Sequence, residues 1–136
     1  MKIFKIILFA VSFLALAACA KSGPQEITLG KDQCENCKMS ITDAKYATQL
    51  ETEKGRNYKF DDISCMQSYA TSNPDKAKNA KTYVADFPSG EFFDSSTATF
   101  INGGSIKSPM GGNTQAYKNK AAAEKAAQEL GATLTQ

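Results

Sequence analysis

The 136-residue sequence contains no histidine. This absence excludes imidazole from any metal site, so a bound metal must rely on sulfur and oxygen ligands. No carboxylate pair placed for catalysis, no nucleophile beside a base and no phosphate-binding loop stands out either. We therefore expect a protein that is not an enzyme.

The N-terminal segment is typical of a bacterial lipoprotein signal peptide. Residues 1–5 form a short basic region with Lys2 and Lys5, and residues 6–16 form an apolar run that is too short to span a bilayer. The letters LAAC at 16–19 match a lipobox, which predicts cleavage before Cys19 and attachment of lipid to its thiol. An ordinary signal peptide with a chance cysteine is the alternative. We expect a lipid anchor in a membrane of the cell envelope, with the protein facing the periplasm or the exterior.

A field of positive charge is also missing. The whole chain has a formal net charge of +2. Removal of the signal peptide takes Lys2 and Lys5 with it, which leaves equal numbers of basic and acidic residues. A protein without a basic surface has no electrostatic basis for binding nucleic acid, so we expect no such partner.

Three regions follow from this interpretation. They are a lipoprotein signal peptide at 1–18, a lipid-anchored tether at 19–33 and one domain at 34–136. The tether is polar and contains glycine and proline, as flexible linkers do. The remaining length fits a single domain of ordinary size.

Hydrophobic periodicity predicts an α+β domain with mostly antiparallel strands and two helices. Residues 46–52 alternate as a half-buried strand does, and 57–60 return after a turn, which predicts a hairpin. Asp62 is a favourable N-cap for a helix that Asn73 and Pro74 end. Further strands are predicted at 81–87, 91–94 and 98–101. A second helix is predicted at 118–130, with an apolar stripe of Ala122, Ala126 and Leu130 and a C-cap at Gly131.

Three cysteines remain after processing: Cys34, Cys37 and Cys65. Cysteines outside the cytoplasm usually pair, but three cannot all pair within one chain. A redox dithiol would need a strand–helix junction around the CxxC, which is not evident here. A structural zinc site would need a carboxylate to complete its four ligands. A plain Cys34–Cys37 disulfide would leave Cys65 unexplained.

Copper(I) fits these residues better, because it is a soft ion that prefers thiolate and thioether ligands and accepts only two or three of them. Cys37 and Met39 lie two residues apart, so an extended segment presents both on one face. Met110 lies in a loop rich in proline and glycine. Cys65 would be the third residue of its helix, where the helix dipole favours thiolate. Met66 is expected in the core.

Three motifs in this order, behind a lipobox, resemble the NosL family of lipoprotein accessory factors of nitrous-oxide reductase. They are CENCKM at 34–39, FDDISCM at 60–66 and SPMG at 108–111. The resemblance implies a periplasmic copper(I) chaperone built from two small ββαβ-type modules, similar to part of an organomercury lyase. It also implies two partners in nitrous-oxide reductase maturation, which serves denitrification: a copper-ABC transporter and the reductase itself.

Residue by residue, Cys37 and Met39 match the family's Cys-Gly-Met pair, and Met110 matches the methionine of its Pro-Met-Gly motif. Lys38 replaces the usual glycine. The chain has no histidine after Pro-Met-Gly, where many members have one, so the third copper ligand stays open.

Two other classes of protein remain as alternatives. One is a thiol-based redox enzyme or an enzyme similar to an organomercurial lyase, which would use Cys34, Cys37 and Cys65. The other is a structural lipoprotein whose cysteines form a zinc site or a disulfide. Metal content separates the chaperone from the structural protein, and turnover of a thiol or an organomercurial would identify the enzyme.

Overall fold

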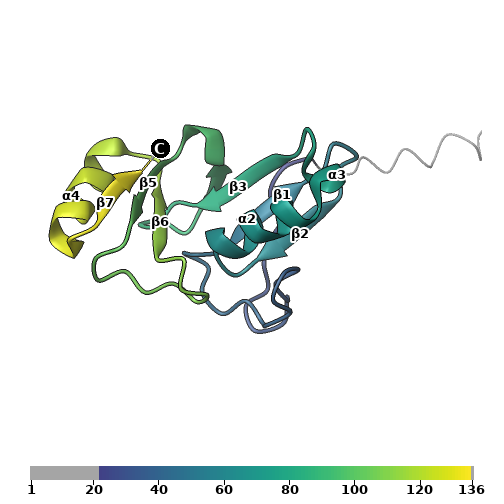
Figure 1. Ribbon diagram of the computed structural model, residues 1–136, viewed down its shortest axis with the longest axis horizontal. Coiled ribbons are helices and arrows are strands. Elements are labelled where there is room, and N and C mark those ends of the chain that lie inside the picture. Colours follow the sequence, from purple (N-terminus) through teal and green to yellow (C-terminus); the bar gives the residue numbers. More distant parts are fainter. Residues whose placement is uncertain (1–21, 136) are drawn as a thin grey trace, which may run out of the picture.

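The computed structural model describes residues 22–135, and the predicted signal peptide and Cys19 lie outside this range. Two modules, each with a sheet and helices, lie side by side in the fold (Figure 1). Within residues 22–135, no helix is both long and apolar enough to cross a membrane.

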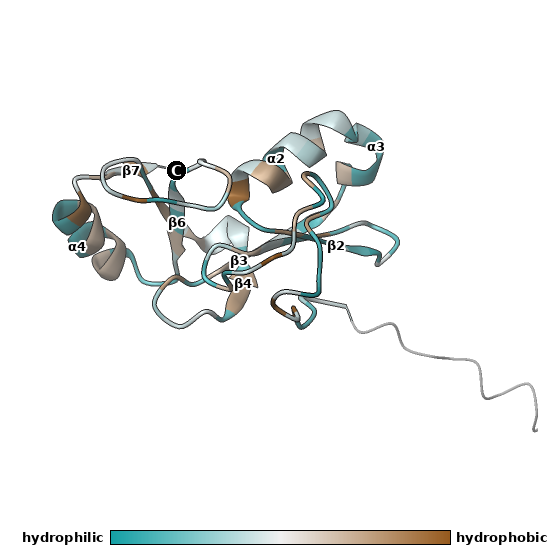
Figure 2. Ribbon diagram, turned by 90° about the horizontal axis from the view of Figure 1, so that it is seen from below, coloured by the Kyte–Doolittle hydropathy of each residue, from teal (hydrophilic) through white to brown (hydrophobic). Residues whose placement is uncertain are grey.

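The first module has a four-stranded antiparallel sheet in the order β2-β1-β3-β4. Its elements follow the chain as β1 (Thr48–Glu51), β2 (Asn57–Phe60), α2 (Ile63–Ser72), α3 (Pro74–Ala77), β3 (Lys81–Ala85) and β4 (Phe92–Asp94). Figure 2 shows that α2 is most hydrophobic at its first turn, whereas α3 is mainly hydrophilic and contains no buried residue.

The second module has a three-stranded antiparallel sheet in the order β6-β5-β7. After the short 3₁₀ helix η1 (Ser95–Thr97), its elements are β5 (Thr99–Asn102), β6 (Thr114–Tyr117), α4 (Lys120–Leu130) and β7 (Thr133–Thr135). Both modules thus contain a β-β-α-β unit. In each unit the first strand lies between the other two strands. This confirms the predicted α+β class and the two ββαβ-like modules.

Several boundaries differ from the prediction. The short helix α3 and the strands β6 and β7 were not predicted. Helix α4 begins at Lys120 because the side chain of Asn119 caps it by accepting a hydrogen bond from the Ala122 amide. Gly131 ends this helix in the left-handed conformation, as expected. The buried face of α4 is formed by Ala123 and Ala127, one position along from the predicted stripe, whose members are only partly buried.

Strand β1 is buried on both faces, although its alternation predicted a half-buried strand. It lies between β2 and β3, and the N-terminal segment covers one of its faces. The Gln49 side chain exchanges two 2.8 Å hydrogen bonds with the backbone of Gln25, and Glu51 accepts a 3.0 Å bond from the Gly23 amide. The described part of the predicted tether therefore packs against the sheet.

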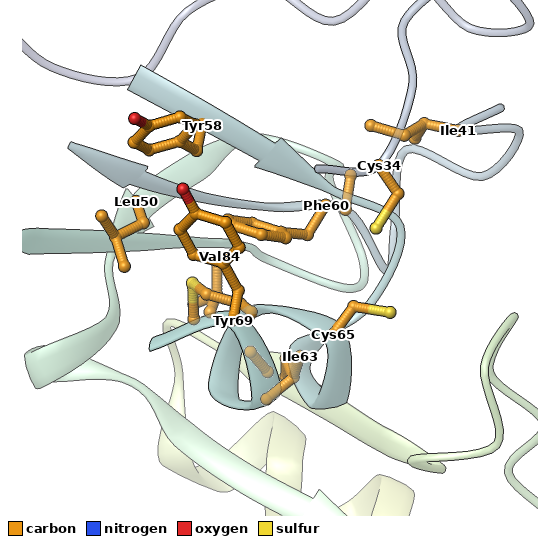
Figure 3. Packing of buried hydrophobic residues seen from close by; sticks show 12 residues of the cluster. Cys34, Ile41, Leu50, Tyr58, Phe60, Ile63, Cys65, Tyr69 and Val84 are labelled. Atoms are coloured by element: carbon orange, nitrogen blue, oxygen red, sulfur yellow. The ribbon is translucent and has the colours of Figure 1, made fainter. Parts of the chain in front are cut away.

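The core of the first module lies between this sheet and α2 (Figure 3). The ring centroids of Phe60 and Tyr69 lie 5.2 Å apart, and those of Tyr58 and Tyr69 lie 5.1 Å apart. Met66 is buried in this core, as predicted. Cys34 and Cys65 lie at one end of it, on the same side of Phe60 in Figure 3. The core thus fixes the position of two of the three thiols.

The two sheets are joined where the residues that follow β3 pair with β6. The Phe87 amide donates a 2.8 Å hydrogen bond to the carbonyl of Ala116, and Asp86 forms a parallel bridge with the same residue. The Asp86 carboxylate accepts hydrogen bonds from the Lys118 amide at 2.9 Å and the Ser89 hydroxyl at 2.7 Å. Burial alone would raise the pKa of Asp86, but these bonds hold it below its usual value.

Candidate metal centre

The CENCKM segment forms a tight turn in front of β1. The Cys34 amide donates to the Met39 carbonyl at 2.8 Å, and the Lys38 amide donates to the Cys34 carbonyl at 2.9 Å. Lys38 adopts a left-handed backbone with φ of 64°, a conformation that favours glycine. The Glu35 amide donates to the carbonyl of Lys59 in β2 at 2.8 Å, which fixes the turn against the sheet.

The other residues of the site come from the junction between β2 and α2. Asp62 caps the helix, as predicted: its Oδ1 accepts from the Cys65 amide at 3.1 Å and from the Ser64 hydroxyl at 2.6 Å. The preceding residue, Asp61, points elsewhere. Its Oδ2 accepts a 3.3 Å hydrogen bond from the Cys37 thiol. The Asn36 side-chain Nδ2 donates to the Cys65 sulfur at 3.7 Å and completes the contact between turn and helix.

Four potential ligand atoms therefore meet between the turn and the helix. The sulfurs of Cys34, Cys37 and Cys65 and one Asp61 oxygen all lie within 4.8 Å of one another. The three thiols are free, so the structure contains no Cys34–Cys37 disulfide. Only Cys37 is partly exposed, whereas the other three residues are buried. The cluster opens to solvent at Cys37.

Burial dominates the electrostatics of the thiols. It raises the pKa of Cys37 to about 11, and contacts with Cys34 and Asp61 act in the same direction. Burial also raises the pKa of Cys65, where Asp61 again adds to the effect. The prediction that the helix dipole favours a Cys65 thiolate is therefore wrong, because the buried position outweighs the dipole. Both pKa shifts favour the protonated thiols in the metal-free protein.

The two methionines predicted as ligands, Met39 and Met110, are both exposed. Met39 is 58% exposed and ends the turn that carries Cys34 and Cys37, and Met110 is 40% exposed in a loop that contacts the start of α2. Asp62 Oδ2 holds the Met110 loop in place by accepting from the Met110 amide at 3.0 Å and from the Ser108 hydroxyl at 2.9 Å. A Cβ atom at Gly112 would lie only 2.7 Å from the Ser64 Cβ, so this loop contacts the start of α2 closely.

Sequence reasoning missed Asp61. It gave Asp62 the role of helix cap and gave Asp61 no role, since a helix needs only one cap. The available signal was the pair of adjacent carboxylates. With Asp62 as the helix cap, Asp61 had no structural role left to fill.

Comparisons with known proteins complete the description of the site. The family model described as NosL matches residues 24–136. The crystal structure of the copper chaperone NosL from Shewanella denitrificans superimposes with a TM-score of 0.72. It shares 20% sequence identity, and the match covers 85% of this chain and 93% of that one. At this identity the likeness shows a common fold. A search of curated proteins gave no match.

Proposed function

Because the chain belongs to the NosL family, we propose that it binds copper(I) and passes it to another protein. One observation carries the proposal: three free thiols meet within 4.8 Å at the edge of the core. Copper(I) is soft and accepts two or three ligands, so three thiols suffice to hold it without histidine. The relative from Shewanella denitrificans, described as a copper chaperone, has the same fold.

The exposed residues give the ion a route into and out of the cluster. Cys37 is the part of the cluster that solvent reaches, so an incoming ion meets this thiol first. Met39 offers a neutral thioether on the turn, and Met110 offers another on the loop that contacts α2. Neutral ligands bind copper(I) without proton loss and release it more easily than thiolates do. In this proposal the cysteines hold the metal, and the methionines exchange it with a donor or an acceptor.

The place of delivery is also part of the proposal. The lipobox supports a lipid anchor at Cys19 on a membrane of the cell envelope, facing the periplasm or the exterior. The motifs shared with NosL proteins support nitrous-oxide reductase as the recipient and a copper-ABC transporter as a second partner.

Anaerobic titration of copper(I) against a chromogenic chelator tests the proposal. The wild-type protein should bind one copper(I), and Cys37→Ala should weaken binding at least tenfold. Met39→Ala and Met110→Ala should mainly speed the transfer of copper to the chelator. Met66→Leu, a change at a methionine buried in the core, is the matched control and should leave binding and transfer unchanged. Wild-type protein that binds no copper(I) under these conditions would disprove the proposal.

A thiol-based enzyme is the second candidate, because a buried carboxylate contacts two of the thiols. A carboxylate in contact with a thiol is placed for acid–base catalysis. Turnover of an organomercurial or a disulfide substrate by the metal-free protein would favour this candidate over the chaperone.

A further inference from the structure

Asp61 has an oxygen that the fold of the metal-free protein does not use. The residue is only 3% exposed, and its Oδ1 has no hydrogen-bond partner within the described part of the chain. Burying a carboxylate oxygen without a hydrogen-bond partner is energetically unfavourable, so the presence of Asp61 at this position calls for an explanation. The other oxygen of Asp61 contacts the Cys37 thiol, which places the carboxylate directly among the thiols.

Copper(I) does not explain this carboxylate. The ion needs no more than the three thiols already present, and an oxygen anion is a hard ligand that it does not prefer. Divalent zinc differs in both respects. It takes four ligands, and it accepts cysteine sulfur and aspartate oxygen in the same site.

The distances also fit a four-coordinate site. Sulfur ligands of a tetrahedral zinc ion lie about 3.8 Å apart, since each zinc–sulfur bond measures about 2.3 Å. The four ligand atoms here already lie within 4.8 Å of one another, so a contraction of about 1 Å would complete the site. Cys34 and Cys65 come from different segments that the core holds together, which limits the ordering that binding would require.

We infer that Cys34, Cys37, Cys65 and Asp61 also bind a divalent cation of the zinc class, with Asp61 as the fourth ligand. This inference rests on the proposed function for its consequence: the two metals compete for the same thiols. A bound divalent cation would keep the three thiols from pairing as disulfides until copper(I) arrives. Copper(I) would then displace the cation, because the thiolates prefer the softer ion.

Cobalt(II) is a suitable probe, because its visible absorption reports coordination number and its near-ultraviolet charge-transfer bands report thiolate ligands. The full-length protein in detergent, reduced and free of metal, should give the intense visible bands of four-coordinate cobalt with thiolate charge transfer. Asp61→Asn should weaken cobalt binding at least tenfold more than it weakens copper(I) binding. Asp75→Asn, at an exposed aspartate in α3, is the matched control and should change neither affinity.

A rescue variant separates ligation from folding. Asp61→Cys supplies a fourth sulfur ligand and should restore cobalt affinity, with stronger charge-transfer absorption than the wild type. Weak cobalt absorption typical of six-coordination in the wild type would overturn the inference, and so would equal cobalt affinity in Asp61→Asn. The copper(I) titration decides the proposed function separately, since a protein that binds cobalt as described but not copper(I) would disprove only the chaperone role.

Discussion

Lys38 shows how one residue of the turn that carries Cys34 and Cys37 affects the stability of that turn. Its φ of 64° costs a side-chain-bearing residue about 1–2 kcal/mol, whereas glycine adopts this conformation freely. We expect Lys38→Gly to raise the free energy of unfolding. The gain should not exceed about 1 kcal/mol, because glycine loses more backbone entropy on folding and this offsets part of the relief. Urea denaturation of the metal-free protein measures the change.

The matched control is Lys107→Gly, because Lys107 does not have a positive φ. This variant should lower the free energy of unfolding. If Lys38→Gly lowered it as well, the left-handed conformation at Lys38 would not be a source of strain.

The sequence was sufficient to identify the thiols of the candidate site but not its carboxylate. Three cysteines besides Cys19, in a chain without histidine, are conspicuous in any sequence, and the structure brings all three together. Asp61 is adjacent to a residue with an ordinary capping role, and only the turn out of β2 determines that the two side chains diverge. The sequence also overestimated the local effect of the helix dipole on Cys65, since the burial of that thiol depends on the packing of distant residues.

At the scale of elements, Asp62 connects α2 with the Met110 loop. One oxygen caps the helix and the other holds the loop. Burial opposes ionisation of this carboxyl, but the hydrogen bonds from Ser64, Cys65, Ser108 and Met110 keep its pKa below the usual value. A single charged group thus couples the helix that carries Cys65 to the loop that carries Met110.

We expect Asp62→Asn to release the loop while it retains the helix cap. An asparagine oxygen can accept from the Cys65 amide, but its nitrogen cannot accept from the Met110 amide. The free energy of unfolding should fall by about 1–3 kcal/mol, and amide exchange at Met110 should accelerate. Hydrogen exchange resolved by residue measures this.

Asp62→Ala is the comparison, since it removes both contacts and should destabilise the protein further. Unchanged exchange at Met110 in Asp62→Asn would show that the aspartate does not hold the loop.

The elements themselves were predictable where the hydrophobic pattern was long. The β1–β2 hairpin and α2 were found because alternation and helical period extend over several residues with clear turns between them. Strands β6 (TQAY) and β7 (TLT) contain only two and one apolar residues, so no apolar alternation marks them as strands. Their strand conformation depends on pairing with β5, which is a tertiary contact.

At the scale of the whole molecule, Asp86 joins the two modules through the Lys118 amide. Its pKa is lowered in the folded protein, so its contribution to stability is present above its unfolded pKa near 3.8 and is lost as pH falls through the folded value. We expect the free energy of unfolding to decrease steeply as the pH is lowered below about 4. Urea denaturation at a series of pH values measures this.

Asp86→Asn should lower the stability at neutral pH by about 1–3 kcal/mol and flatten its acid dependence. Asp75→Asn, in the exposed first turn of α3, should leave the profile nearly unchanged. A variant at Asp86 with the same acid profile as the wild type would contradict the assignment of this carboxylate to the junction.

The predicted lipid anchor is tested on the intact cell. Cys19→Ser removes the thiol that would carry the lipid, so the protein should leave the membrane fraction or accumulate with its signal peptide attached. Fractionation followed by mass measurement detects both results. Normal processing together with full membrane retention in Cys19→Ser would rule out lipidation at this position.

The hydrogen bond between the Glu35 amide and the Lys59 carbonyl has a consequence for solubility. Strand β2 lies at the edge of its sheet, and an uncovered edge strand can pair with a strand of another molecule. The N-terminal segment is also held beside this strand, since the Lys59 side chain bonds to the Glu26 carbonyl and to Asp32. The turn that gathers the thiols therefore also protects the protein from self-association, and a chain shortened to begin after this turn would be prone to aggregate through β2.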